Sequence, residues 1–358
     1  MTADVELDRL TVRFGGFTAV EDASLRIRPG EFFSFLGPSG CGKTTILRTI
    51  SGFIEPSAGA VRIGGRDMTG IGANRRPTAL IFQNLALFPM MSVAENVGYG
   101  LRVRGVRRRE RLATVERLLN LVALGDQGAK KIDELSGGQR QRVAIARALA
   151  VEPQVLLLDA PLSALDLKLR QHMRNELRAI QRRVGLTFIY ITHDQGEALA
   201  MSDRIAVMNR GRIEQIGDGR TVYDAPETEF VARFVGETNV FRGRVAAVAD
   251  GEAAVDTPRG RLRGRNPRRL MQGAEALLFV RPEFLQPGLR AENGCEAETL
   301  VVAYEGNLTH AAFQGPDGVP LMALLGGAAR QTPPAPGERV HLGFAARDAV
   351  VLPPGAHA

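Results

Sequence analysis

A glycine-rich turn near the amino terminus, GPSGCGKTT over residues 37–45, is the part of this sequence best suited to chemistry. It fits the pattern G-x-x-x-x-G-K-[ST], in which backbone N–H groups converge on phosphate oxygens where a Cβ atom would obstruct them. Lys43 can reach β- and γ-phosphates, and the Thr44 hydroxyl can ligate Mg²⁺. The candidate phosphate-binding residues are Gly37, Pro38, Ser39, Gly40, Cys41, Gly42, Lys43, Thr44 and Thr45.

Three polar residues, Gln83, Asp159 and His193, each follow an apolar run that is typical of a buried strand. Because ligands of α/β sheets bind at the carboxyl ends of the strands, we expect all three beside the phosphate loop. Asp159 would hold Mg²⁺ through water, and Gln83 would touch Mg²⁺ or the attacking water. His193 would donate to a γ-phosphate oxygen and orient that water. The alternatives are that Asp159 only caps the next helix and that His193 has a structural role. Their expected place at the same carboxyl edge of the sheet disfavours both.

An aromatic residue lies on each side of the Gly15-Gly16 turn. Phe14 is our candidate for stacking on adenine, whereas we expect Phe17 to be part of the core.

A second glycine-rich helix start, LSGGQRQR over residues 135–142, resembles the first in its chemistry. A serine N-cap followed by glycines at a helix N-terminus can receive an anion. Two such starts on different subdomains suggest that two copies pack head to tail, with each ATP between the loop of one copy and the helix of the other. The candidate residues here are Ser136, Gly137, Gly138 and Gln139.

The elements around these motifs predict two domains, in line with a length of 358 residues. Residues 1–238 read as an α/β nucleotide-binding domain, interrupted by a helical subdomain at about 86–150 that opens on a capping box at Ser92 and Glu95. After Asn239 the sequence changes to short strands separated by glycine and proline. Residues 239–358 are therefore expected to form an all-β barrel or sandwich.

The net charge of +7 would suit an anionic partner. Arginine is spread over every segment, however, and no basic stripe is interleaved with aromatic residues, so no nucleic acid partner is expected. The two cysteines, Cys41 and Cys295, predict a reducing compartment, because a disulfide at Cys41 would distort the phosphate loop. No apolar leader or membrane-length apolar stretch is apparent, so we expect a cytosolic protein that meets a membrane only through a partner.

Together these motifs resemble the ATP-binding subunits of ATP-binding cassette (ABC) importers along almost the whole chain. GPSGCGKTT matches Walker A, Gln83 the Q-loop, LSGGQ the signature, VLLLD the Walker B strand, SALD the D-loop and His193 the switch histidine. The resemblance adds Asp166 of the D-loop to the nucleotide-binding residues. The segment containing Val280-Arg281-Pro282-Glu283 is similar to the OB-type transport-associated domains of one importer subgroup.

The resemblance implies ATP and Mg²⁺ as cofactors, a second copy of the chain, membrane permease subunits, and a periplasmic or surface solute-binding protein. It places the chain at the cytoplasmic face of the plasma membrane as a peripheral subunit. Residues 168–205 are most similar to spermidine/putrescine importers, although iron(III), phosphonate and glycerol-phosphate systems share the pattern.

One departure from the family pattern concerns catalysis. The Walker B aspartate is usually followed by a glutamate that polarises the attacking water, and here Ala160 follows Asp159. Loss of a positioned general base lowers a rate by about 10²- to 10⁴-fold, so we expect ATP-driven dimerisation to survive while hydrolysis is slow. An ABC-type ATPase that acts on nucleic acid and a nucleotide-gated regulator are alternative functions. A small-molecule kinase is disfavoured because it would have no need of LSGGQ.

Overall fold

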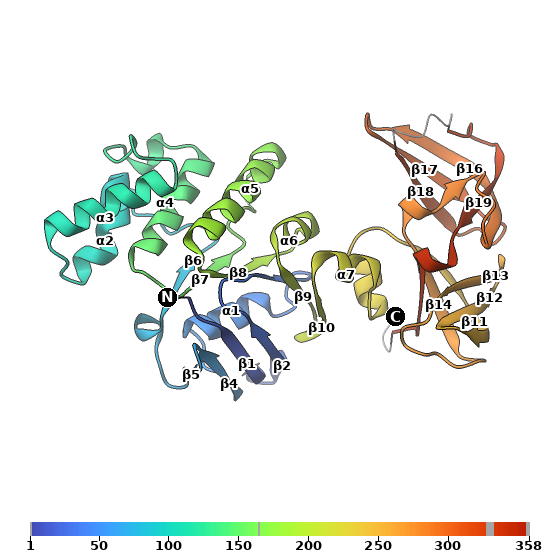
Figure 1. Ribbon diagram of the computed structural model, residues 1–358, viewed down its shortest axis with the longest axis horizontal. Coiled ribbons are helices and arrows are strands. Elements are labelled where there is room, and N and C mark those ends of the chain that lie inside the picture. Colours follow the sequence, from blue (N-terminus) through green and yellow to red (C-terminus); the bar gives the residue numbers. More distant parts are fainter. Residues whose placement is uncertain (1, 164, 327–332, 356–358) are drawn as a thin grey trace. The chain divides into compact units, whose positions relative to one another are not determined.

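The computed structural model describes residues 2–163, 165–326 and 333–355. The chain forms two compact units, Met1–Gly219 and Arg220–Ala358, which are described separately (Figure 1). Their limits differ from the predicted domain limits by the segment 220–238. This segment groups with the second unit and contains most of helix α7 (Gly219–Asp224) and all of α8 (Glu229–Phe234).

A six-stranded sheet organises the first unit, in the order β10-β9-β3-β8-β7-β6. Its strands are β3 (Phe32–Leu36), β6 (Thr78–Ile81), β7 (Val155–Asp159), β8 (Thr187–Thr192), β9 (Arg204–Asn209) and β10 (Arg212–Gly217). All neighbours pair in parallel except β9 and β10. Every residue of β3 and β8 is buried, as expected for central parallel strands covered on both faces.

A four-stranded sheet, in the order β2-β1-β4-β5, covers one face of this sheet together with helix α1 (Lys43–Ser51). It is built from β1 (Val5–Phe14), β2 (Phe17–Ile27), β4 (Ala58–Ile63) and β5 (Arg66–Asp67). Strand β2 follows β1 through a tight turn at Gly15, which pairs Phe14 directly with Phe17. The phosphate loop therefore begins at the end of a strand enclosed on both sides.

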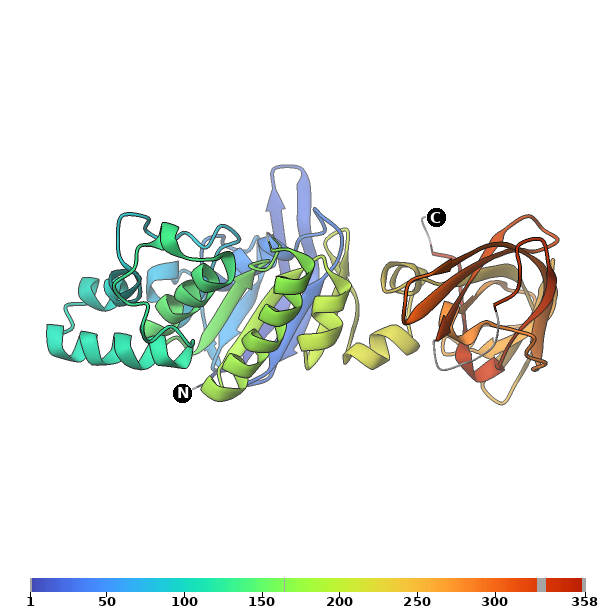
Figure 2. The ribbon, with the colours of Figure 1, turned by 90° about the horizontal axis from the view of Figure 1, so that it is seen from above.

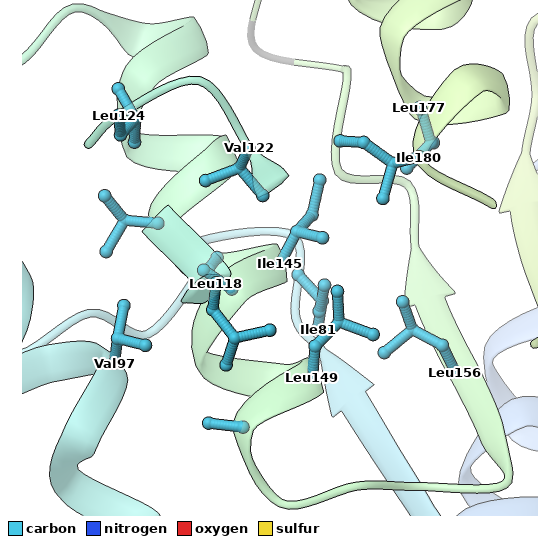
Figure 3. Packing of buried hydrophobic residues seen from close by; sticks show 14 of the residues in the cluster. Ile81, Val97, Leu118, Val122, Leu124, Ile145, Leu149, Leu156, Leu177 and Ile180 are labelled. Atoms are coloured by element: carbon cyan, nitrogen blue, oxygen red, sulfur yellow. The ribbon is translucent and has the colours of Figure 1, made fainter. Parts of the chain in front are cut away.

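The other face packs against helices. These are α2 (Val93–Val103), α3 (Arg108–Leu121), α4 (Gly137–Ala150), α5 (Leu167–Val184) and α6 (Gln195–Met201). Helices α2, α3 and α4 lie together near β6 (Figures 1 and 2) and form the expected helical insert, with the predicted capping box at Ser92 and Glu95. Figure 3 shows Ile145 and Leu149 of α4 directed towards Ile81 of β6. This shared core holds α4 against the sheet.

The second unit consists of β-strands apart from α7, α8 and short 3₁₀ turns. Strands β11 (Asn239–Ala249), β12 (Glu252–Thr257), β13 (Gly260–Arg265), β14 (Glu275–Val280) and β20 (Ala349–Leu352) close into a barrel. Strands β15 (Gln286–Pro287), β16 (Asn293–Tyr304), β17 (Leu308–Gln314), β18 (Pro320–Gly326) and β19 (Arg339–Phe344) form a five-stranded sheet. One buried core joins barrel and sheet, which confirms the predicted all-β accessory domain.

Among the described residues, no helix combines the length and the apolarity that crossing a bilayer requires.

Candidate functional site

A cleft of about 580 Å³ opens at the carboxyl edge of the six-stranded sheet. The structure brings eleven of the predicted site residues to it: Phe14, Ser39, Gly40, Gly42, Lys43, Thr44, Thr45, Gln83, Asp159, Ala160 and His193. Gly37, Pro38 and Cys41 belong to the same loop but are not part of the lining. Ser136, Gly137, Gly138, Gln139 and Asp166 are not part of it either.

The phosphate loop takes a backbone path that only glycine adopts easily. Gly40 and Gly42 have φ angles of 79° and 105°, in the left-handed region. A Cβ at Gly42 would lie 2.4 Å from the carbonyl oxygen of Ala19, whereas a Cβ at Gly40 would meet no atom within 4 Å. At position 42, both the nearby carbonyl oxygen and the positive φ require glycine. At position 40, only the positive φ requires it. Helix α1 then starts without a side-chain cap, so its first N–H groups stay available to an anion.

Lys43 is held inside the loop that precedes it. Its Nζ donates to the carbonyl oxygens of Gly37 (2.7 Å) and Pro38 (2.8 Å), and the residue is only 8% exposed. The thiol of Cys41 lies beneath the loop, 3.5 Å from the same nitrogen. The loop thus keeps a buried ammonium group directly under the uncapped helix start, where phosphate oxygens would meet positive charge from two sources.

Asp159 and Thr44 form the part of the cleft that fits a cation. The Thr44 hydroxyl donates to Oδ1 of Asp159 at 3.3 Å. Burial raises the pKa of the Asp159 carboxyl, and the Thr44 hydrogen bond and the charges of Arg48 and Lys43 oppose that rise. A divalent cation would favour the charged carboxylate, and both side chains supply the oxygen ligands that Mg²⁺ prefers. No group of three His, Cys, Asp or Glu residues gathers as a ready-made metal site in the described chain. Gln83, which the sequence analysis also gave as a possible Mg²⁺ contact, lines the same cleft, and phosphate oxygens and water could supply further ligands.

Gln83, Ala160 and His193 line the same cleft as the phosphate loop. Gln83 Nε2 donates to the Ser163 hydroxyl at 3.1 Å, and that hydroxyl donates to the carbonyl oxygen of Ala160 at 2.9 Å. Ala160 has a φ of 43°, and its N–H donates to the carbonyl of Ile191 in β8. The imidazole of His193 is exposed at the end of β8. A methyl group thus stands where the family pattern has a glutamate.

Phe14 and Phe17 both line the cleft, so the expectation that Phe17 belongs to the core was wrong. Phe14 is 50% exposed and Phe17 is 62% exposed. The two residues are directly paired across the turn between β1 and β2, and paired residues point to the same face of a hairpin. An adenine ring thus has two exposed aromatic side chains available to it.

The serine-glycine start of α4 is well formed, and it lies outside the cleft. The Ser136 hydroxyl accepts from the N–H of Gln139 (3.3 Å), and the Gln139 side chain accepts from the N–H of Ser136 (2.9 Å). A Cβ at Gly137 would lie 3.0 Å from Cδ2 of Leu165, so the helix start packs closely on the D-loop segment. Asp166 of that segment caps α5 by accepting from the N–H of Leu169. Ala164 of the same motif lies outside the described residues.

Two arginines near the site were missed by the sequence analysis. Arg147 of α4 donates to the carbonyl oxygens of Leu85 and Ala86, just after Gln83. Arg170 of α5 donates to Leu165 of the D-loop segment and to Asp194, beside His193. Both lie in amphipathic helices, where an arginine is usual on the solvent side, so helical spacing carries no sign of these contacts.

Comparisons with known proteins identify the family of the chain. A family model described as ABC transporter matches residues 20–163, and one described as TOBE domain matches residues 278–352. The chain is 49% identical to the spermidine/putrescine import ATP-binding protein PotA of Rubrobacter xylanophilus, over 97% of this chain and 93% of that protein. It is 46% identical to the Fe(3+) ions import ATP-binding protein FbpC of Agrobacterium fabrum, over 84% of this chain and 85% of that protein. Among solved structures, cbiO1 from Clostridium perfringens, part of the ABC transporter complex cbiONQ, has a TM-score of 0.58 and 28% identity. The match covers 61% of this chain and 89% of cbiO1.

Proposed function

The chain belongs to the ATP-binding subunits of ABC transporters, and on this premise we propose that it drives the import of a polyamine such as spermidine or putrescine. The observation that carries the substrate class is the 49% identity to a spermidine/putrescine import protein over nearly the full length of both chains. Iron(III) is the second candidate, favoured by the 46% identity to an Fe(3+) import protein.

The nucleotide in this proposal is Mg·ATP. Lys43 and the N–H groups that start α1 hold the phosphates, and Thr44 and Asp159 hold the cation. Phe14 and Phe17 flank the base. When bound there by Thr44 and Asp159, Mg²⁺ would supply positive charge to offset the negative charge on the phosphate oxygens. Gln83 and His193 orient the attacking water beside the γ-phosphate.

A second copy of the chain completes the site. The start of α4 has the N-cap and glycines of an anion-binding helix terminus, yet it does not line the cleft of its own chain. In a head-to-tail dimer, Ser136 and Gly138 of one copy reach the γ-phosphate held by Lys43 of the other. ATP then binds the closed dimer better than the open one, and hydrolysis releases it.

Replacing Ser136 with arginine tests this arrangement. Ser136→Arg should leave ATP affinity of the monomer unchanged while ATP-induced dimerisation disappears, as measured by equilibrium binding and analytical ultracentrifugation. Ala113→Arg, on an exposed position of α3, adds the same charge and should dimerise normally. Normal dimerisation of Ser136→Arg would refute the two-copy site.

Hydrolysis in this dimer is slow because Ala160 offers no general base, and His193 supports the residual rate. We expect Ala160→Glu to accelerate hydrolysis by about 10²- to 10⁴-fold, with the permease present. Ala160→Gln has the same length but no basic carboxylate, and it should stay slow. Alanine and glutamate meet the same restriction at a φ of 43°, so the exchange adds no backbone strain. If Ala160→Glu is no faster than Ala160→Gln, another residue supplies the base.

The chain works at the cytoplasmic face of the plasma membrane, on a permease that receives its solute from a periplasmic or surface solute-binding protein. Two exposed apolar side chains support a permease contact in this region. Phe53 is 59% exposed and its ring packs against Phe82, next to Gln83, and Met90, further along the segment that follows Gln83, is 85% exposed. Co-purification of the permease, followed by ATPase measurements in proteoliposomes with loaded binding protein, tests the substrate. Stimulation by iron(III) and not by spermidine or putrescine would refute the polyamine assignment.

A further inference from the structure

The loops that follow β7 and β8 are joined by one side chain, that of Arg170. Its Nη2 donates to the carbonyl oxygen of Leu165 (2.9 Å), and its Nη1 donates to Oδ2 of Asp194 (3.1 Å). Arg170 lies in the first turn of α5, and its side chain is only 24% exposed. Any shift of the segment 165–167 is therefore passed to the residue beside His193.

Asp194 holds the backbone around His193. Its N–H donates to the Thr192 hydroxyl (2.9 Å), and its Oδ1 accepts from the N–H of Glu197 as the cap of α6. His193 lies between Thr192 and Asp194, so a displaced Asp194 turns the imidazole relative to the cleft. The position of the Asp194 carboxylate thus determines the direction in which the His193 imidazole points.

An incomplete ion pair lies behind this contact. Arg170 Nε and Glu197 Oε1 are 3.9 Å apart, and within the described part of the chain neither atom has a hydrogen-bond partner. The other oxygen of Glu197 accepts from Tyr190 (2.7 Å) and from Thr192 (2.6 Å), and the Glu197 side chain is 2% exposed. Glu197 is anchored to β8, so Arg170 is the partner that can move. Buried charged groups without their hydrogen bonds favour any shift that completes the pair.

The segment that could deliver such a shift is exposed. Leu167 is 68% exposed at the start of α5, beside the exposed Asp166. Leu165 packs on Gly137 at the start of α4, the helix terminus that the proposed function assigns to the nucleotide of a second copy. The exposed Leu167 side chain is therefore suited to be covered by the second copy of the chain.

We propose that Arg170 is a positioning residue that couples docking of a second copy at residues 165–167 to the orientation of His193. The inference rests on the proposed head-to-tail dimer. Docking moves the start of α5, the Nε of Arg170 closes on Glu197, and Asp194 follows with His193 attached. Water attack is thereby favoured only when the second copy is in place.

The test measures single-turnover ATP hydrolysis, ATP affinity and ATP-induced dimerisation of the full chain in the Ala160→Glu background. Arg170→Met should slow hydrolysis by about tenfold or more, because a misplaced catalytic group lowers the rate steeply. ATP affinity and dimerisation should change by less than about twofold. Arg182→Met, at an exposed position of the same helix, is the matched control and should behave like the parent.

A double variant separates positioning from a general structural role. If Arg170 acts through His193, Arg170→Met combined with His193→Ala is no slower than His193→Ala alone. If Arg170→Met slows His193→Ala by the same factor as it slows the parent, the proposal is overturned. It is also overturned if Arg170→Met hydrolyses ATP at the parent rate.

A third variant covers the case in which Arg170→Met does not fold. Arg170→Lys cannot bridge Leu165, Asp194 and Glu197 with one ammonium group, so it should be slower than the parent; a parent-like rate would refute the coupling. The Ser136→Arg variant tests the head-to-tail arrangement separately. If that arrangement is wrong, Ser136→Arg still dimerises with ATP, whatever the result for Arg170.

Discussion

Replacing Arg147 with methionine should loosen the turn that follows Gln83. Leu85 and Ala86 have φ angles of 60° and 45°, and a left-handed residue other than glycine costs about 1 to 2 kcal/mol. Arg147 donates to the carbonyl oxygen of Ala86 at 2.7 Å and to that of Leu85 at 2.8 Å. Hydrogen bonds from a charged donor contribute about 1.5 to 3 kcal/mol each. The free energy that the two hydrogen bonds contribute therefore exceeds, by a small margin, the free energy that the two left-handed residues cost.

The margin sets the expected size of the effect. Loss of both bonds removes about 3 to 6 kcal/mol, and relaxation of the two residues returns about 2 to 4 kcal/mol. Arg147→Met should therefore lower the free energy of unfolding by about 1 to 2 kcal/mol. Once the turn relaxes, the Gln83 amide leaves the Ser163 hydroxyl, so kcat should fall while the KM for ATP changes little.

Urea unfolding and steady-state ATPase measurements check both effects. Arg140→Met, at an exposed position of the same helix, is the control for the urea unfolding. Adding Ala86→Gly to Arg147→Met should recover part of the stability, because glycine adopts the left-handed conformation without strain. If Arg147→Met differs from Arg140→Met by less than about 0.5 kcal/mol, the turn does not depend on the arginine.

Three further predictions concern Asp159, Arg76 and the aromatic pair. Burial raises the pKa of Asp159, so its charge destabilises the nucleotide-free fold above the folded-state pKa. The penalty fades as the pH falls towards the unfolded value of 3.8. Asp159→Asn should raise the Tm at pH 8, lose this advantage in acid, and abolish hydrolysis with Mg·ATP. The buried Arg76 guanidinium donates to four backbone carbonyls, so Arg76→Met should lower stability by about 3 to 5 kcal/mol in urea unfolding. Phe14→Ala and Phe17→Ala should each weaken ATP binding by about 1 to 3 kcal/mol in calorimetric titrations, and an unchanged Kd would remove that residue from the base site.

The sequence was most informative where one backbone path needs one residue type. The phosphate loop is predictable because Gly42 meets both a positive φ and a close carbonyl, a combination no other residue satisfies. The ends of β7 and β8 are predictable because strands buried on both faces leave long apolar runs. Both features depend on residues that are close together in the chain, so the sequence pattern alone is enough to predict them.

The sequence was least informative about long-range polar contacts and weakly apolar strands. Arg147 and Arg170 act through carbonyl oxygens and acids on other elements, and no spacing rule encodes such pairs. Strand β13 reads GRLRGR, a weak strand pattern, because only Leu262 and Gly264 in it are buried. Phe17 was misassigned because its partner across the turn, rather than its own hydrophobicity, decides which face it occupies.

Two side chains of the cleft lie beside segments that arginines on other elements hold. Gln83 precedes the turn whose carbonyl oxygens accept from Arg147 of α4, and His193 precedes Asp194, which accepts from Arg170 of α5. The two arginines belong to α4 and α5, whose starts pack on each other through Gly137 and Leu165. In the proposed dimer, a second copy that docks on this packed pair would act on Gln83 and His193 at once. Such a geometry favours hydrolysis that is coupled to dimer closure over hydrolysis by a free subunit.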